Sequence, residues 1–254
     1  MARIVEIYRY PVKGLSAEPL ERVSIDVGEV IPFDRVYAIE NGPSPFDPKS
    51  PKWISKIAFL MLMRHERLAQ LRTHFDERTH NLTIRRDGVM LAEGWLDTEQ
   101  GRRAIETFFD AFSAEDLQGP ARVLSAPGHS FQDTSGGKVV SLINLESVRE
   151  LSRKMGVEVH PLRFRGNLHV EDLPAWGEYS WVGKAVVAGS VTFMVTKRID
   201  RCAAINVDPL TGARDLDIPR CLRETYDNID CGVYLRVMEA GEISVGNSIG
   251  PMVG

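Results

Sequence analysis

The 254-residue chain has few cysteines and no strong excess of charge of either sign. Its three cysteines are widely spaced and odd in number, so they do not form a disulfide framework. Three thiols also cannot supply a four-cysteine iron–sulfur site. This cysteine usage is typical of a reducing compartment. The formal net charge of -4 argues against general nucleic-acid binding, which needs a basic surface.

Long apolar runs and several common catalytic motifs are also missing. The longest apolar run, Ile57 to Met63, is far shorter than a membrane span. The N-terminus alternates apolar and polar residues and lacks the apolar block of a signal peptide, so we expect a soluble, cytoplasmic protein. The six histidines include no zincin pair, and the chain has neither a Walker A loop nor a Gly-x-Gly-x-x-Gly segment. A zinc hydrolase and a phosphate-cradle nucleotide enzyme are therefore unsupported.

The apolar pattern that is present favours a mainly β fold with a few helices. Short apolar runs separated by glycines fill the second half of the chain, at residues 139–142, 168–170, 184–188, 191–196, 233–237 and 243–245. Residues 2–9 predict a first strand that ends before Pro11. Many short strands with few helices favour an antiparallel barrel or sandwich over an alternating α/β sheet.

Two segments have the apolar period of a helix. Residues 97–113 predict one helix, with Asp97 as its N-cap and a buried stripe of phenylalanines. Residues 145–155 predict another, with Asn144 as N-cap and Gly156 as terminator. Residues 53–75 fit either a helix or strands, and we expect strands there, followed by a hairpin turn at residues 79–81.

A weak boundary at Gln118-Gly119-Pro120 divides the chain. It predicts a β-rich N-terminal domain over residues 1–119 and a second domain over residues 120–254. Residues 41–52 hold four prolines among small and polar residues, without a periodic pattern. Loops of that length are commonly lids or mobile segments.

The segment Lys197-Arg198-Ile199-Asp200-Arg201-Cys202 places a cysteine after three cationic side chains. A thiol beside cations is stabilised as the thiolate, the form that binds metals and attacks electrophiles. The following Asp208-Pro209-x-Thr211-Gly212 predicts a turn that can hold the thiolate at the mouth of a pocket. The alternative is that Cys202 is a small buried hydrophobe, as most free cysteines are.

Several other polar residues can converge on one anionic ligand. They are Lys13, Arg35, Arg163, Arg165, Arg198 and Arg201, with Asn144 and Asn167 as neutral hydrogen-bonding groups. Arginine binds phosphate through two parallel hydrogen bonds, and a thiolate suits a soft or high-valent metal. Taken singly, each basic residue is better explained as a solvated surface charge.

Together these motifs resemble the MOSC family, whose fold is that of the molybdenum-cofactor sulfurase C-terminal domain, here with the N-terminal β-barrel domain that often precedes it. The resemblance rests on Tyr10-Pro11-Val12-Lys13, Asp34-Arg35, Ser141-x-x-Asn144, Arg163-Phe164-Arg165-Gly166-Asn167, and Arg201-Cys202-x-x-x-x-Val207-Asp208-Pro209-x-Thr211-Gly212. It covers essentially the whole chain and is strongest from residue 139 onward. Two positions depart from the family pattern: Gly166 replaces a proline found in close relatives, and Asn247 replaces the usual aspartate.

The resemblance implies an antiparallel β-barrel that holds the pterin-based molybdenum cofactor. Members similar to the mitochondrial amidoxime-reducing component ligate molybdenum through the cysteine that matches Cys202. By the same comparison, Lys13, Arg35 and Arg165 are expected to bind the pterin phosphate and ring edges. The remaining residues expected to contact the cofactor in this pocket are Ser141, Asn144, Asn167 and Arg201.

Three functions follow from the resemblance. The first is a molybdenum-cofactor oxidoreductase that reduces N-hydroxylated or N-oxide small molecules by oxygen-atom transfer. Because no haem, flavin or cluster motif is visible, its electrons would come from a separate reductase or ferredoxin-like partner. The second is sulfur transfer through a Cys202 persulfide supplied by a cysteine desulfurase, and the third is a non-catalytic cofactor carrier. The family is also associated with pyridoxal-phosphate-dependent sulfurases, but this chain has no evident Schiff-base lysine context.

Overall fold

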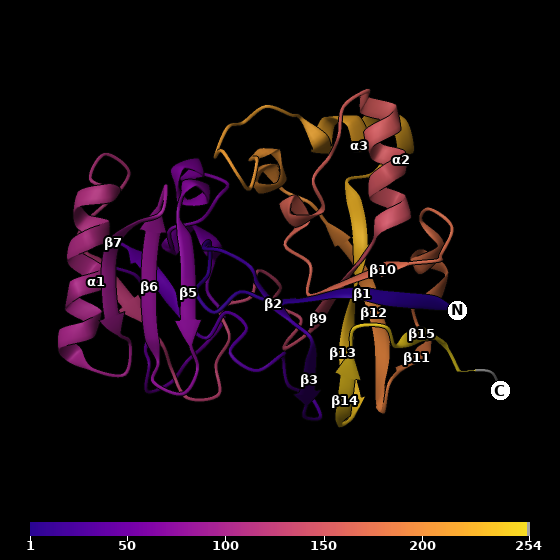
Figure 1. The fold of residues 1–254 in the computed structure, drawn as a ribbon, viewed down its shortest axis with the longest axis horizontal. Coiled ribbons are helices and arrows are strands. Elements are labelled where there is room, and N and C mark those ends of the chain that lie inside the picture. The colour runs from indigo at the N-terminus through magenta and orange to yellow at the C-terminus, as the bar shows by residue number, and fades with distance from the viewer. Residues whose placement is uncertain (253–254) are drawn as a thin grey trace.

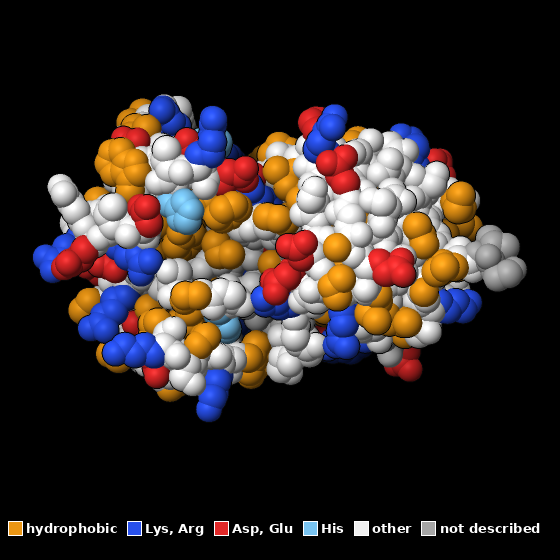
Figure 2. All heavy atoms as spheres, turned by 90° about the horizontal axis from the view of Figure 1, so that it is seen from below, with side chains coloured by type: hydrophobic (Ala, Val, Ile, Leu, Met, Phe, Trp, Pro, Cys, Tyr) orange, Lys and Arg blue, Asp and Glu red, His pale blue; other side chains and the backbone are white. Residues whose placement is uncertain are grey.

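The computed structural model describes residues 1–252, which form two lobes lying side by side (Figure 1). One lobe holds a β-barrel with two helices, and the other holds small sheets and one helix. Viewed from below, lysine and arginine side chains are interspersed with aspartate and glutamate over both lobes (Figure 2). This mixture agrees with a chain of small net charge.

A closed ring of seven strands forms the barrel. Its strands pair in the cyclic order β1 (Ala2–Arg9), β10 (Leu168–Glu171), β9 (Val140–Asn144), β13 (Asp230–Glu239), β12 (Val191–Asp200), β11 (Ala185–Ala188) and β15 (Ser248–Pro251), which returns to β1. Only the β9–β10 pair in this ring is parallel. Alternate apolar side chains fill the interior, including Ile4, Leu142 and Phe193, each 0% exposed. The predicted mainly β barrel is confirmed, and closure leaves the ring without an edge strand.

Short strands extend the barrel at its lower rim. β2 (Glu18–Leu20) pairs with the end of β1, and β3 (Arg22–Ile25) pairs with β14 (Gly241–Ser244). The first strand of the chain therefore lies in the same barrel as strands from its last third. The division into domains 1–119 and 120–254 stays a prediction.

Two helices lie together at one end of the barrel (Figure 1). The first, α2 (Leu145–Met155), begins where the Asn144 side chain accepts the Glu146 N–H and ends at Gly156, whose φ is 68°. Both predicted ends are confirmed, because a capping amide and a left-handed glycine are strong local signals. The second, α3 (Ile218–Tyr226), was not predicted, although Asp217 caps it and a proline lies in its first turn.

The second lobe contains the antiparallel sheet β5 (Arg72–Asp76), β6 (Asn81–Arg86) and β7 (Val89–Trp95), with α1 (Glu99–Phe112) packed on it. A further pair, β4 (Ala38–Asn41) and β8 (Ala121–Leu124), lies beside them. The predicted hairpin turn at residues 79–81 is confirmed. The predicted cap of α1 is wrong by one residue, because the Thr98 hydroxyl, not Asp97, accepts the Gly101 N–H.

The strands expected between residues 53 and 71 are not formed by these described residues. This stretch contains two 3-10 helices, η1 (Lys56–Ala58) and η2 (Glu66–Gln70), and one isolated bridge between Phe59 and Glu40. Its apolar run is nonetheless buried, with Phe59 and Leu60 at most 2% exposed. A continuous apolar run signals burial but does not distinguish a strand from a packed irregular segment.

No helix within residues 1–252 is both long and apolar enough to cross a membrane.

Candidate functional site

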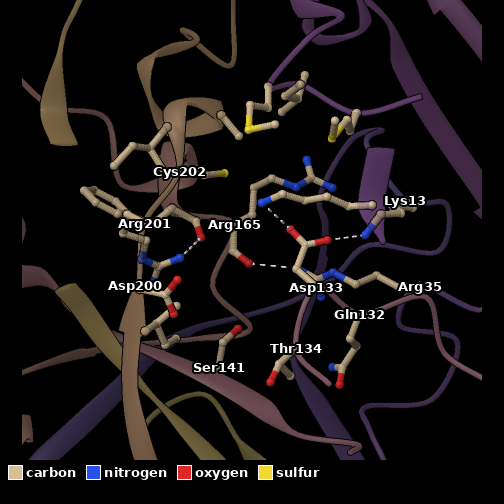
Figure 3. Close-up of a pocket in the computed structure, with 18 of the residues that line it drawn as sticks. Lys13, Arg35, Gln132, Asp133, Thr134, Ser141, Arg165, Asp200, Arg201 and Cys202 are labelled. Atoms are coloured by element: carbon tan, nitrogen blue, oxygen red, sulfur yellow. Dashed lines mark hydrogen bonds and ion pairs between the residues drawn. The ribbon is translucent and has the colours of Figure 1, made fainter. Parts of the chain in front are cut away.

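A cavity of about 300 Å³ lies between the barrel and the second lobe. It brings together seven of the eight residues predicted for the site: Lys13, Arg35, Ser141, Arg165, Asn167, Arg201 and Cys202. They come from five separate parts of the chain. Figure 3 shows the Cys202 sulfur on one side of the cavity and Lys13 and Arg35 on the opposite side.

Cys202 follows the end of β12 and precedes the 3-10 helix η5 (Ala203–Asn206). It is partly exposed at the cavity wall, unlike Cys231, which is fully buried and whose thiol pKa burial raises to about 12. An accessible thiol can react or bind a metal, whereas Cys231 stays a protonated core side chain. The interpretation of Cys202 as a buried hydrophobe is therefore not supported.

The predicted turn behind Cys202 is confirmed. The Asp208 Oδ1 accepts the N–H groups of Leu210 at 2.9 Å and Thr211 at 2.8 Å. The Arg163 Nη2 lies 3.1 Å from the other Asp208 oxygen and 2.8 Å from Asp215. Arg163 is 3% exposed and thus anchors the whole turn to the barrel lobe. The role of these turn residues is structural, since they fix the backbone that follows Cys202.

Two guanidinium groups lie against the ring of one buried tyrosine. The Arg35 and Arg165 Cζ atoms are 4.6 Å and 4.3 Å from the Tyr10 ring centroid. Burial raises the Tyr10 pKa to about 12, so the phenol stays neutral and donates to the Gly166 carbonyl. Both arginines have left-handed backbones, with φ of 55° and 51°. Such conformations are disfavoured for branched side-chain residues and cluster at functional sites.

The two arginines differ in how their charge is balanced. Arg35 forms an ion pair with Asp34, a fully buried carboxylate that also accepts the Tyr10 N–H at 2.9 Å. Arg165 forms no ion pair with any residue from 1 to 252; its Nη1 donates to the Leu15 carbonyl at 2.8 Å, and its buried Nη2 has no partner. Burial lowers the Arg165 pKa to about 10, which still leaves it cationic near neutral pH. A buried, charged and incompletely bonded guanidinium favours an anionic ligand.

Lys13 and Lys56 share one carboxylate on the next wall of the cavity. The Lys13 ammonium is buried, donates to the Phe131 carbonyl at 2.8 Å and forms an ion pair with Asp133. The Lys56 Nζ lies 3.7 Å from the other Asp133 oxygen. Burial acts to raise the Asp133 pKa, but the two lysines outweigh it and lower that pKa to about 2. Asp133 is therefore ionised throughout the physiological range.

Lys56 also lies close to the thiol. Burial acts to lower the Lys56 pKa, but Asp133 and, after it, Cys202 outweigh burial and raise that pKa. Sequence reasoning found neither Lys56 nor Asp133, because no motif includes them: Lys56 lies on the 3-10 helix η1, and Asp133 lies on an irregular loop. The proline-rich loop before η1 packs its Phe46 on Phe131, with ring centroids 4.9 Å apart. This contact joins that loop to the loop that carries Asp133.

Ser141 and Asn167 line the cavity but bond mainly to each other. The Ser141 hydroxyl donates to the Asn167 side-chain oxygen at 2.8 Å and accepts the Asn167 N–H at 3.0 Å. The Asn167 Nδ2 donates to the Tyr8 carbonyl at 3.1 Å. These bonds tie β9, β10 and β1 together directly beneath the cavity.

Arg201 and Asn144 use their polar atoms within the fold. Arg201 donates to the carbonyl oxygens of Phe164, at 2.9 Å, and Cys231, at 2.7 Å. Asn144 is not among the residues that line the cavity; it is fully buried, and its Nδ2 donates to Glu178 at 2.9 Å. Of the other basic candidates, Arg198 packs on Tyr179, 4.2 Å from the ring centroid, and does not line the cavity.

Comparison with known proteins supports the sequence resemblance. Residues 127–250 match the family model described as "MOSC domain". The molybdenum cofactor sulfurase of Caenorhabditis elegans is 25% identical over 244 residues, which cover 92% of this chain and 33% of that protein. The protein of the same name from Caenorhabditis briggsae is 32% identical over 120 residues, which cover 45% of this chain and 16% of that protein. The chain thus spans a third or less of these relatives.

Among solved structures, the YuaD protein from Bacillus subtilis covers 98% of this chain and 94% of its own, with 13% identity and a TM-score of 0.44. YiiM from Geobacillus stearothermophilus covers 45% of this chain and 54% of its own, with 19% identity and a TM-score of 0.36.

Proposed function

Because residues 127–250 belong to the MOSC domain family, we propose that this chain binds the molybdenum cofactor in the cavity between its lobes and acts as an oxidoreductase. The proposal rests on one observation: a cationic group and a thiol line the same cavity. Arg165 offers a buried positive charge without an ion-pair partner in residues 1–252, and Cys202 offers an accessible thiol. A cofactor with a phosphate at one end and a metal at the other needs both.

The residues present fit such a group at its anionic end. The unpartnered Arg165 Nη2 and the buried Lys13 ammonium lie where hydrogen bonds to phosphate oxygens would be charge-assisted. Arg35 is held in place by Asp34 and packs on the same tyrosine as Arg165. A buried, preorganised cation loses little conformational entropy on binding, which favours tight retention of the ligand.

The opposite end fits a metal. A thiolate is the protein ligand best suited to a soft or high-valent metal, and the Lys56 ammonium lies close to Cys202. When bound, the cofactor supplies oxygen-atom transfer coupled to a two-electron redox change. The protein then has three tasks: Cys202 anchors the metal end, the cations orient the phosphate end, and the two loops limit access of water.

The substrate would be an N-hydroxylated or N-oxide small molecule that gives up oxygen, and the electrons would come from a separate reductase or ferredoxin-like protein. These finer assignments rest on the similarity of the Cys202 motif to the amidoxime-reducing group of the family. They are tested by turnover of benzamidoxime with reduced methyl viologen, an artificial donor that replaces the partner.

Sulfur transfer is the second candidate, and the accessibility of Cys202 favours it too. A persulfide on this cysteine would be a stabilised anion beside Lys56, and a cysteine desulfurase would supply the sulfur. The two nematode relatives named as molybdenum cofactor sulfurases agree with such a role. The test is release of labelled sulfide by dithiothreitol after incubation with a desulfurase and labelled cysteine.

Metal and pterin analysis separates these candidates. The chain is produced in a host fed with molybdate, next to Cys202→Ala and the control Cys221→Ala, which removes the α3 thiol. Near-stoichiometric molybdenum and pterin in the native chain and the control, with metal lost from Cys202→Ala, are expected. Metal and pterin retained in Cys202→Ala would instead favour a carrier. Absence from all three, in a host shown to make the cofactor, would overturn the proposal in favour of sulfur transfer.

A further inference from the structure

The cavity that collects cations also contains a carboxylate at its centre. Asp133 lies between Lys13 and Lys56, and Figure 3 shows its carboxylate among the side chains that line the cavity, joined by a dashed line to Lys13. Its side chain is 48% exposed, whereas that of Lys13 is 7% exposed. A purely structural counter-ion would be expected to be buried with its partner.

We propose that Asp133 is an internal competitor for the anionic ligand of this cavity, occupying the lysine charges that the ligand must take over. The inference rests on the proposed function only in taking that ligand to carry a phosphate-like group. Asp133 thereby sets how strongly charged a ligand must be to bind.

The charges of the described cavity residues support this role. Near Asp133 lie four cations, Lys13, Lys56, Arg35 and Arg165, of which Arg35 is already paired with Asp34. Asp34 is fully buried against Arg35 and is not available for exchange. Because Arg163, Lys197 and Arg201 also line the cavity and Asp133 and Asp200 are its lining carboxylates, cations outnumber carboxylates there, which suits a phosphate monoester with its nearly two negative charges at neutral pH. Asp133 would repel that dianion unless it moved.

Movement, not protonation, is the available route. Because the pKa of Asp133 is about 2, the carboxylate stays charged at any pH at which the protein works. Its segment continues through Gly136 and Gly137, and Gly137 has a φ of 92° with open space where a Cβ would lie. Rotation of this exposed segment would withdraw Asp133 and release both lysines to the ligand.

The test is calorimetric titration of the full chain, purified without cofactor, with inorganic phosphate at low ionic strength. Asp133→Asn keeps the side-chain shape and removes the charge, and it should bind phosphate at least about tenfold more tightly than the native chain. Asp133→Glu restores the charge and should stay within about threefold of native. Asp200→Asn removes a charge elsewhere on the cavity wall and should have a clearly smaller effect than Asp133→Asn.

The pH dependence gives a second reading. When the titration is repeated with sulfate, which stays a dianion over this range, the ratio of affinities between Asp133→Asn and the native chain should be constant from pH 5 to 8, since Asp133 does not titrate near neutrality. Equal affinities, a ratio that collapses as the pH falls to 5, or no phosphate binding by Asp133→Asn would each overturn the inference. Should Asp133→Asn not fold, Asp133→Ser carries the same expectation.

These outcomes are separable from failure of the proposed function. In one outcome, Asp133→Asn binds phosphate more tightly in a chain that never acquires molybdenum or pterin. That result would support the role of Asp133 as a competitor and reject the proposal that the chain binds the molybdenum cofactor. Unchanged phosphate binding in a chain that does acquire both would reject the competitor and leave the cofactor proposal standing.

Discussion

Two groups of basic residues reach the same cavity, and they differ in what balances their charge. Arg163 and Arg201 direct their donors at protein acceptors, namely the carboxylates of Asp208 and Asp215 and the carbonyls of Phe164 and Cys231. Arg163 and Arg165 each have one unpartnered guanidinium nitrogen, but Arg165 has no carboxylate partner within residues 1–252, and Lys13 and Lys56 share one carboxylate. The first group holds the site together, and the second is left for a ligand.

The difference shows why the type of residue does not reveal its role. Arg163 and Arg165 are two positions apart and both nearly buried, yet only Arg163 has carboxylate partners within the described chain. A buried charge with partners contributes to the fold, whereas one without partners costs stability until a ligand arrives. Substitutions at the two positions should therefore act on different measurements.

Arg163→Ala should give the largest loss of stability. It leaves Asp208 and Asp215 without their cation, and the free energy of unfolding should fall by about 3 kcal/mol, near the lower end for broken buried pairs because Asp215 is 45% exposed. Urea denaturation measures it. The matched control is Arg149→Ala, an arginine that also pairs with two carboxylates but is 48% exposed, and it should cost less than about 1 kcal/mol. Equal losses of unfolding free energy in Arg163→Ala and Arg149→Ala would contradict the structural role assigned to Arg163.

Arg165→Met should separate binding from stability. Since the substitution removes a desolvated and unpaired charge, the free energy of unfolding should change by less than about 1 kcal/mol. Loss of a charge-assisted bond should reduce retention of molybdenum and pterin at least about tenfold on dilution. Arg198→Met, which alters an arginine outside the cavity, is the control and should retain both. A strongly destabilised Arg165→Met protein would move Arg165 into the structural group.

Lys56→Met should slow alkylation of Cys202 by iodoacetamide by about threefold to tenfold at pH 7.5, because a nearby ammonium favours the reactive thiolate. Mass spectrometry of the modified peptide measures the rate. Lys197→Met is the control, since that lysine lines the cavity but packs over Tyr234, 5.7 Å from the ring centroid. An unchanged alkylation rate in Lys56→Met would show that Lys56 does not affect the reactivity of Cys202 and acts only as an ion-pair partner of Asp133.

The smallest expected effect is a pH-dependent contribution of Asp133 to stability. Its folded-state pKa of about 2 lies below its ordinary value of 3.8, so the ion pairs stabilise the fold above pH 4 and are lost between pH 4 and 2. Because the side chain is 48% exposed, solvent screening limits the contribution to about 1 kcal/mol. Asp133→Asn should be less stable than native at pH 6 by that amount, and the difference should vanish by pH 2. A difference that persists to pH 2 would have another cause.

The sequence predicted the parts of the molecule that local patterns determine. Alternating apolar residues and glycines located the barrel strands, and Asn144 with Gly156 bounded α2 because both ends are local hydrogen-bonding features. The Cys202 segment was found for the same reason, since its thiol, cations and turn are contiguous.

The parts that were missed depend on distant packing. Lys56 reaches the cavity on the short 3-10 helix η1 and Asp133 on an irregular loop, and the adjoining segments make aromatic contacts such as Phe46 with Phe131. The sequence also could not divide the arginines into two groups. That division depends on acceptors that are distant in sequence from the arginines, such as Asp215 for Arg163 and the Cys231 carbonyl for Arg201. Motif resemblance gathered residues of which seven line one cavity, but the surrounding contacts distinguish their separate tasks.

The closed ring of the barrel also constrains how this chain folds. Ala2 pairs with Ile249 and Arg3 with Glu171, so the strand synthesised first is completed on both sides by strands synthesised much later. Contacts between such distant residues form slowly, because the intervening loop must be closed before they stabilise anything. On the ribosome, β1 has to stay without its barrel neighbours while the second lobe is made. The second lobe, built from contiguous hairpins and α1, can form during that wait.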